Sequence, residues 1–300
     1  MQNLSTPAPS TLPPPDDVRA GVVSVRCAYS LAGPHRLVVG AVTEALARHG
    51  LAVRLGAPPS DPAGVRGTIL VGPAEPVRDP CVLVDTRPPS RREGAAVWSD
   101  QRAGARSVVT HLIGLGHRRI AAIARAGDAA PPHSWLAVVP EPHRVRLVGD
   151  PGDPCAAGDP GGPGDPCDPG DPGGAGGAGE AAGWRAAHEL LGGAEPPTAV
   201  VCGDDRLAAG VLRAAHERGL RVPKDLSVAG FDTAGLGAFT RPELTVVRHR
   251  WADLGHRAAT VLLDLLGGAP GVPPRIELPA DLVIRDSTGP VKGVVARVGS

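Results

Sequence analysis

Four acidic residues stand directly after predicted β-strands, where their carboxylates could bind a small molecule. They are Asp85, Asp204, Asp205 and Asp232. In an open parallel sheet, ligands bind in the crevice beyond the carboxyl ends of the strands, and a carboxylate there accepts hydrogen bonds from the hydroxyls of a sugar or nucleoside. The alternative is that each aspartate caps the next helix, which is a common use of this residue. We favour a helix cap for Asp205, and a ligand contact for Asp232 because no strong helical pattern follows it.

No catalytic or metal-binding motif accompanies these acids. The sequence contains no GxSxG, Walker A or HExxH motif, and His188-Glu189 lacks a second histidine. The five cysteines include no CxxC pair, which favours neither a disulfide framework nor a zinc site and fits a reducing cytoplasm. Residues 174–179 match GxGxxG, but the nearest upstream strand, 145–148, is too distant for the turn of a dinucleotide site. We therefore predict no enzyme activity, no cofactor and no bound metal.

Predicted strands and helices alternate along the chain, and these elements position the acidic residues. The last helix illustrates the pattern, because its apolar residues recur at three- and four-residue spacing from Leu254 to Leu265. Predicted strands lie at about 21–25, 51–55, 68–71, 81–85, 120–124, 199–202 and 226–231, and predicted helices at about 34–50, 100–116, 205–218 and 251–266. Such alternation is typical of parallel sheets with crossover helices, so the sequence predicts an α/β fold.

The charge balance argues against nucleic-acid binding by the chain as a whole. Its 300 residues include 31 Lys and Arg against 31 Asp and Glu, a net charge of zero. Only two of the basic residues are lysines, Lys224 and Lys292. A protein that binds phosphates of nucleic acid usually has a basic excess. Neither a secretory signal nor an apolar run long enough for a membrane span is visible, so we expect a cytoplasmic protein without a membrane partner.

Two segments depart from the alternating pattern. Residues 1–18, rich in Pro, Ser and Thr, are expected to form a disordered tail. Residues 149–180 form a Gly/Asp/Pro insertion with a three-residue period, which we interpret as a flexible surface segment. It is too short for a collagen helix by itself, and its aspartates lack the spacing of a calcium loop.

Several stretches together resemble the LacI/GalR family of transcriptional regulators. They appear in the family's order as THLIGLGHRRIAAIA (110–124), PPTAVVCGDDRLAAGVLRAAHERGLRVPKDLSVAGFD (196–232), RPELTVVRHRWADLGHRAATVLLDLL (241–266) and LPADLVIRDST (278–288). The resemblance implies a two-lobed, periplasmic-binding-protein-like α/β fold with parallel sheets, hinge strands that cross between the lobes, and a ligand cleft between them.

The resemblance also implies a division of the chain, a partner and a mode of action. Lobe 1 would hold 19–124 and 247–270, and lobe 2 would hold 125–246 and 271–290, with the insertion inside lobe 2. It further implies a homodimer in which a small-molecule effector, of the sugar or nucleoside class, shifts the equilibrium between lobe arrangements.

Four residues match effector-site positions of the family. Asp232 matches an aspartate that bonds sugar hydroxyls, and Asp204 stands where the family commonly has asparagine. His249 falls at a position of polar effector contact, and Trp251 where relatives place an aromatic ring against the effector. For Trp251 a partly buried aromatic at a helix start is an equally good interpretation.

The sequence departs from the family at three places. A Pro-rich tail stands before the first strand instead of a helix-turn-helix headpiece, so we expect DNA binding only if a headpiece is supplied upstream or by a partner. The family's effector-clamping arginine has no counterpart, and 131–135 reads PPHSW in its place. Between Leu55 and Thr68 there is no room for the usual crossover helix. The alternatives to a regulator are therefore a cytoplasmic sugar-binding protein or a degenerate paralogue that does not bind DNA.

Overall fold

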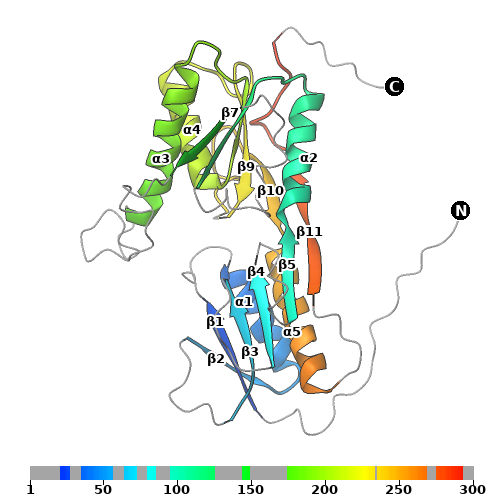
Figure 1. Ribbon diagram of the computed structural model, residues 1–300. Coiled ribbons are helices and arrows are strands. Elements are labelled where there is room, and N and C mark those ends of the chain that lie inside the picture. Colours follow the sequence, from blue (N-terminus) through cyan, green and yellow to red (C-terminus); the bar gives the residue numbers. More distant parts are fainter. Residues whose placement is uncertain are drawn as a thin grey trace, which may run out of the picture.

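A computed structural model describes residues 21–27, 35–56, 64–72, 80–85, 95–125, 144–148, 174–233, 235–268 and 275–292. Their helices and strands form two α/β lobes, one above the other (Figure 1). In chain order the elements are β1 (Val22–Cys27), α1 (His35–Ala47), β2 (Ala52–Leu55), β3 (Val65–Val71), β4 (Cys81–Asp85), β5 (Ala95–Asp100), α2 (Gln101–Gly114), β6 (Ile120–Arg125), β7 (Arg144–Val148), α3 (Gly174–Leu191), β8 (Ala199–Cys202), α4 (Asp205–Glu217), β9 (Ser227–Asp232), β10 (Thr245–His249), α5 (Trp251–Leu266) and β11 (Arg275–Val283).

The first lobe is a parallel sheet in the order β2-β1-β3-β4-β5-β11. Its core forms where alternate strand residues such as Val23 and Ile69 meet the apolar faces of α1 and α5. These two helices pack with their backbones close together, because a Cβ on Gly255 would lie 2.4 Å from the carbonyl oxygen of Val38. The buried cluster fixes α5, and therefore its first residue Trp251, against the sheet.

The second lobe continues the same eleven-stranded sheet in the order β11-β10-β9-β8-β6-β7. All of its strand pairs are parallel except β10 with β11. Helices α3 and α4 cover one face and α2 covers the other, so the lobe has two core layers. This architecture confirms the predicted α/β fold with parallel sheets and strands that cross between lobes.

The chain passes between the lobes at three adjacent places. It leaves β5 for α2 at Asp100, and it leaves β10 for α5 at Arg250. The third crossing is β11 itself, whose residues 275–279 pair with β5 and whose residues 280–283 pair with β10 (Figure 1). Because these connections lie side by side, the site predicted between the lobes is bounded by the ends of β5, β9 and β10.

The lobe boundaries differ from the ranges expected from the sequence. We expected 19–124 in lobe 1, but α2 and β6 belong to the second lobe, where Ala105, Val108 and Leu112 pack against β6, β8, β9 and β10. The first half of β11 belongs to the first sheet, although 271–290 was expected in lobe 2. The physical reason is that the apolar face of α2 is buried by the second sheet, so the chain crosses before this helix.

The expected Gly/Asp/Pro insertion is also shorter than 149–180. Helix α3 already begins at Gly174, so the last residues of that segment are helical. Residues 149–173, like the tail 1–18, lie outside the described residues. The connection from β2 to β3 is short as expected, because β3 starts at Val65 and both strands flank β1.

Candidate functional site

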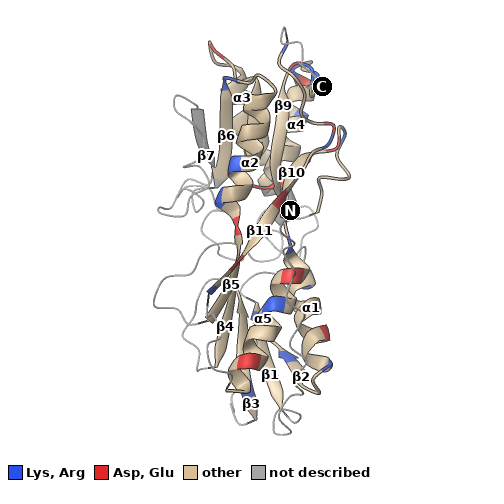
Figure 2. Ribbon diagram, turned by 90° about the vertical axis from the view of Figure 1, so that its right-hand side faces the viewer, with Lys and Arg blue, Asp and Glu red and all other residues tan. Residues whose placement is uncertain are grey.

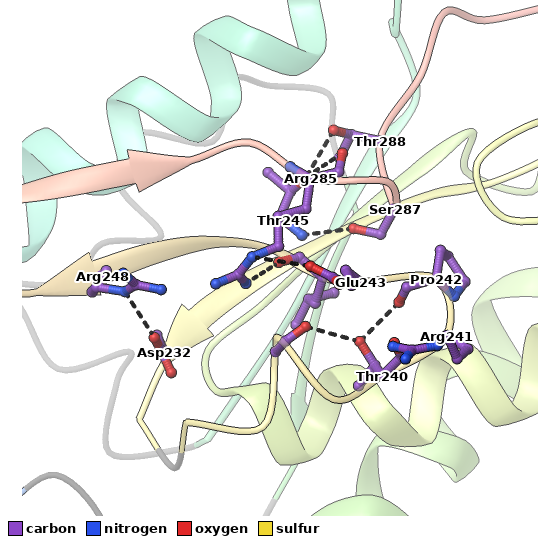
Figure 3. Close-up of polar contacts among 12 residues, drawn as sticks. Asp232, Thr240, Arg241, Pro242, Glu243, Thr245, Arg248, Arg285, Ser287 and Thr288 are labelled. Atoms are coloured by element: carbon purple, nitrogen blue, oxygen red, sulfur yellow. Dashed lines mark hydrogen bonds and ion pairs between the residues drawn. The ribbon is translucent and has the colours of Figure 1, made fainter.

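Asp232 ends β9 and lies beside Arg248 of β10. The two residues are register partners on parallel strands, and Arg248 Nε donates to Asp232 Oδ2 at 3.2 Å (Figure 3). The Asp232 side chain is only 14% exposed, whereas that of Arg248 is 47% exposed. The second carboxylate oxygen, Oδ1, is buried and has no hydrogen-bond partner among the described residues. A buried acceptor without a partner is costly, so this atom is suited to accept a hydrogen bond from a ligand.

His249 lies on the opposite face of the sheet from Arg248, because successive strand residues point to opposite faces. Its ring is buried, and its Nδ1 forms a 2.8 Å hydrogen bond with Ser99 Oγ of β5. The other ring nitrogen, Nε2, is buried and meets no hydrogen-bond partner in the part of the chain that the structure describes. Burial lowers the pKa of His249 to about 4, so its imidazole is neutral at pH 7.

Trp251, the first residue of α5, connects this histidine to the first lobe. Its ring meets those of His249 and His35 edge-on, with centroids 5.1 and 5.6 Å away. On the other side His249 stacks with Phe231 of β9 at 6.1 Å. Trp251 is 9% exposed and belongs to the first core, whereas Phe231 belongs to the second. The four rings form an aromatic row across the junction of the lobes, which favours the buried helix-start interpretation of Trp251.

The two neighbouring aspartates after β8 have different roles from those expected. Asp204 caps α4, because its Oδ1 accepts the Leu207 N–H at 2.7 Å. We had favoured Asp205 as the cap and Asp204 as a ligand contact. Asp205 is instead fully buried, and its two oxygens accept the Thr233 hydroxyl at 3.1 Å and the Leu236 N–H at 2.9 Å. It therefore fixes the loop that follows Asp232.

An ion pair that the sequence analysis did not identify joins two of the crossings. Arg250, which precedes α5, donates to both carboxylate oxygens of Asp281 on β11 at 2.8 and 2.9 Å. These bonds raise the pKa of Arg250 and lower that of Asp281. Both side chains are about half exposed, so the pair fixes geometry more than it stabilises the fold. No motif in the sequence signals this pair, because its two residues are 31 positions apart.

Hydrogen bonds of hydroxyl groups join the segment after β11 to the start of β10, the strand that carries the partner of Asp232. Ser287 Oγ accepts the Thr245 N–H at 2.8 Å, and Thr245 Oγ1 lies 2.9 Å from Thr288 Oγ1 (Figure 3). Arg285 donates to the Leu244 carbonyl at 2.6 Å and lies 3.8 Å from Glu243. This network holds β10, and hence Arg248 and His249, in a fixed position.

The remaining expectations concern Asp85, metal binding, membrane spans and the distribution of charge. Asp85 ends β4, at the carboxyl edge of the first sheet. Within the described ranges no three His, Cys, Asp or Glu side chains gather closely enough to hold a metal ion. None of the described helices combines the length and apolar character needed to cross a bilayer. Acidic and basic residues are interspersed over both lobes (Figure 2).

Two lobes that share one sheet, with three crossings between them and buried polar atoms that lack a partner among the described residues, have the architecture of a two-lobed ligand-binding domain. Residues 166–288 match the family model for a periplasmic binding protein-like domain. The HTH-type transcriptional regulator reg1 of Streptomyces lividans is 35% identical over 214 residues, which cover 71% of this chain and 57% of the relative. The HTH-type transcriptional repressor CytR of Escherichia coli is 41% identical over 108 residues, or 36% of this chain and 31% of the relative.

Solved structures show the same fold over most of the chain. A LacI transcriptional regulator from a Rhodococcus species is 26% identical, with a TM-score of 0.66 over 90% of this chain and 99% of that one. A LacI family regulator from Enterococcus faecium, solved with bound ribose, is 20% identical, with a TM-score of 0.65 over 90% and 100% of the two chains. Over most of its length the chain is therefore similar to the periplasmic-binding-protein-like domain of LacI-family regulators. It spans 57% of the length of the Streptomyces relative.

Proposed function

We propose that the domain senses a small hydroxyl-rich effector, a sugar or a nucleoside, at the junction of its lobes. The observation that carries the proposal is Asp232 Oδ1, a buried acceptor at the carboxyl end of β9 that no described residue bonds. Charged acceptors bond hydroxyl groups strongly, and ligands of open parallel sheets bind at this edge. Ribose in the E. faecium neighbour supports the class of ligand.

The other residues at the junction would restrict how the effector lies. Arg248 already bonds Asp232 Oδ2, so an effector hydroxyl would approach Oδ1. His249 Nε2, on the other face of the sheet, is a second polar atom that has no partner within the described ranges. Trp251 would form a wall of the site and not a stacking platform, because its ring already contacts two histidines. We do not assign Asp204 a ligand bond through Oδ1, since that atom caps α4.

Asp232→Ala should weaken effector binding roughly ten- to a hundred-fold, because a hydrogen bond to a charged group contributes about 1.5–3 kcal/mol. Calorimetric titration of the wild type with a panel that includes ribose, other pentoses and hexoses, and nucleosides identifies the ligand, and the variant is then titrated with it. Asp281→Ala is the matched control, because it also removes a paired carboxylate at the junction. Equal affinity of wild type and Asp232→Ala would show that the site is misplaced, and a panel without any binder would contradict the sensor function itself.

The response to the effector is proposed to be transcriptional. The relatives reg1 and CytR are named as HTH-type regulators, and they extend well beyond the matched region. We propose a cytoplasmic, non-enzymatic sensor that controls DNA binding by a helix-turn-helix segment joined to it or supplied by a partner. If the domain binds a sugar but the intact system shows no effector-dependent retardation of operator DNA, a sugar-binding protein becomes the better assignment.

We also propose that two copies associate through the turn that follows β9. Phe239 is 82% exposed on this turn, next to the 38% exposed Leu236, whose carbonyl accepts the Phe239 N–H at 2.8 Å. The Thr240 hydroxyl lies 2.8 Å from the Pro242 carbonyl oxygen and 3.1 Å from that of Gly237, and its single proton, shared between the two, restrains the turn (Figure 3). A rigid exposed aromatic residue is characteristic of interface centres.

Phe239→Glu should therefore weaken self-association at least tenfold, because it places a charge in an apolar contact. Sedimentation velocity over a concentration series measures the effect. Leu265→Glu, at an exposed position of α5, serves as the control and should leave association unchanged. A monomeric wild type, or a variant that dimerises like the wild type, would refute this interface.

A further inference from the structure

A cavity lies in the second lobe, at the end remote from the hinge. It is about 600 Å³ in volume, within the usual range for small-molecule sites. Its lining includes Arg119 and Thr198, which directly precede β6 and β8, so it lies at the amino ends of these strands. The crossings and Asp232 lie at the carboxyl ends of the sheet, so the cavity is separate from the proposed effector site.

The lining of this cavity is strongly basic. Among the described residues that line it are Arg118, Arg119, Lys224 and Lys292, with one carboxylate, that of Asp225. The two lysines are the only ones in the chain, although they are far apart in sequence. In a chain of zero net charge this concentration of cations is local, and it arises from three segments that the fold brings together.

The one carboxylate is already neutralised. Asp225 Oδ2 accepts Arg221 Nε at 2.7 Å, Oδ1 accepts the second nitrogen at 3.1 Å, and Lys292 forms an ion pair with Oδ1. These partners hold the pKa of the Asp225 carboxyl far below its usual range. The positive charge of the lining therefore exceeds what its own acid can balance.

The C-termini of two helices offset part of this positive charge but not all of it. Helices α2 and α4 both end at the cavity, where Gly116 and Leu220 follow their caps. A helix C-terminus carries a partial charge of about −0.5, so two termini offset about one positive charge. An excess of about two positive charges remains, which matches the charge of about −1.5 to −2 on a phosphate monoester at pH 7.

The cavity floor is rigid and neutral. His117 is buried, and its ring nitrogens lie 3.0 Å from Thr198 Oγ1, Ser227 Oγ and the Gly289 carbonyl oxygen. Burial lowers its pKa, so it adds no charge at neutral pH. The Val291 N–H bonds the Leu115 carbonyl at 3.1 Å and fixes the segment that carries Lys292. The cationic groups are therefore attached to an ordered frame.

We propose that this cavity is a second ligand site, which binds a small phosphorylated molecule through Lys224, Lys292, Arg118 and Arg119. The volume exceeds that of a bare phosphate, so the organic part of a monoester would fill the remainder. Inorganic phosphate would bind to the same groups with lower affinity, because it makes fewer contacts.

Calorimetric titration at constant ionic strength tests the site with three probes, ribose 5-phosphate, inorganic phosphate and ribose. The double variant Lys224→Gln/Lys292→Gln should bind ribose 5-phosphate at least tenfold more weakly than the wild type, which corresponds to about 1.4 kcal/mol. Arg257→Gln, which removes an exposed cation from α5 in the other lobe, is the matched control. Asp232→Ala and Arg248→Ala report on binding at the lobe junction instead.

The outcomes separate the alternatives. Loss of ribose 5-phosphate binding in the lysine variant, with the control and the junction variants unchanged, supports the second site. If only Arg248→Ala loses ribose 5-phosphate binding, the phosphate binds at the lobe junction, and the proposal is overturned. It would equally be overturned by the absence of saturable binding, or by lysine variants that bind as the wild type does. Ribose binding is the internal reference, because the lysine substitutions should not affect it.

Discussion

Gly210→Val should destabilise the protein by about 3 kcal/mol and lower its thermal midpoint by roughly 10 °C. Gly210 lies on α4 where this helix meets α3, and a Cβ there would lie 2.0 Å from the Glu180 carbonyl oxygen and 2.5 Å from the Trp184 amide nitrogen. These are backbone atoms, so no side-chain rotation relieves the overlap. Gly183 makes the reciprocal approach, because its Cβ would lie 2.2 Å from the Leu207 carbonyl oxygen. The helices would have to separate and lose their packing on the second core.

Gly40→Val is the matched control, since it places the same side chain on α1 where nothing lies within 4 Å. Valine has a higher helix propensity than glycine, so the control should leave stability unchanged or raise it slightly. Thermal unfolding followed by circular dichroism measures both variants. Similar midpoints for Gly210→Val and the wild type would show that α3 and α4 are not in backbone contact.

This contact also explains why the start of α3 was misassigned from the sequence. Residues 174–180 consist mainly of glycine and alanine and continue a low-complexity run, so they were assigned to the insertion. Small residues suit a close helix pair, but their spacing becomes informative only when the partner helix is known. The alternation of strands and helices was predictable because apolar periodicity is local. The crossing at Asp100 was not predictable, because the sheet that buries α2 is determined by contacts between residues distant in sequence.

The candidate site was predictable to a similar extent. Strand ends were correctly expected to carry Asp232 and Asp204 to the edge of the second sheet. His249 was named only through the family resemblance, because no strand was predicted where β10 lies. The assignment of the helix cap to Asp205 was wrong, because Asp204 caps α4. Either residue of an adjacent pair can cap a helix, and the choice depends on the loop that Asp205 contacts. Arg248 was missed because its pairing with Asp232 depends on strand register. Ser99 was missed for the same reason, since it meets His249 across a lobe crossing.

The stability of the folded chain should fall at acid pH because His249 is buried at the lobe crossing. Burial lowers the folded-state pKa to about 4, from a usual value of 6.5. Above pH 6.5 the imidazole is neutral in the folded and unfolded chain and has no effect on stability. Between pH 6.5 and 4 the unfolded chain takes up a proton that the folded chain does not, so stability falls as pH falls. The full loss is about 3 kcal/mol, since each pKa unit corresponds to 1.36 kcal/mol.

His249→Gln should remove this dependence, because glutamine does not titrate. Urea unfolding of the wild type and the variant from pH 7.5 to 4 gives two curves whose difference isolates His249, since the carboxylates and the other histidines are common to both. Ser99→Ala removes the hydrogen bond to Nδ1 but leaves the ring between Phe231 and Trp251. It should keep the steep pH dependence, because desolvation and not the serine lowers the pKa. Parallel curves for wild type and His249→Gln would show that the ring is solvated, and that the aromatic row across the hinge opens in solution.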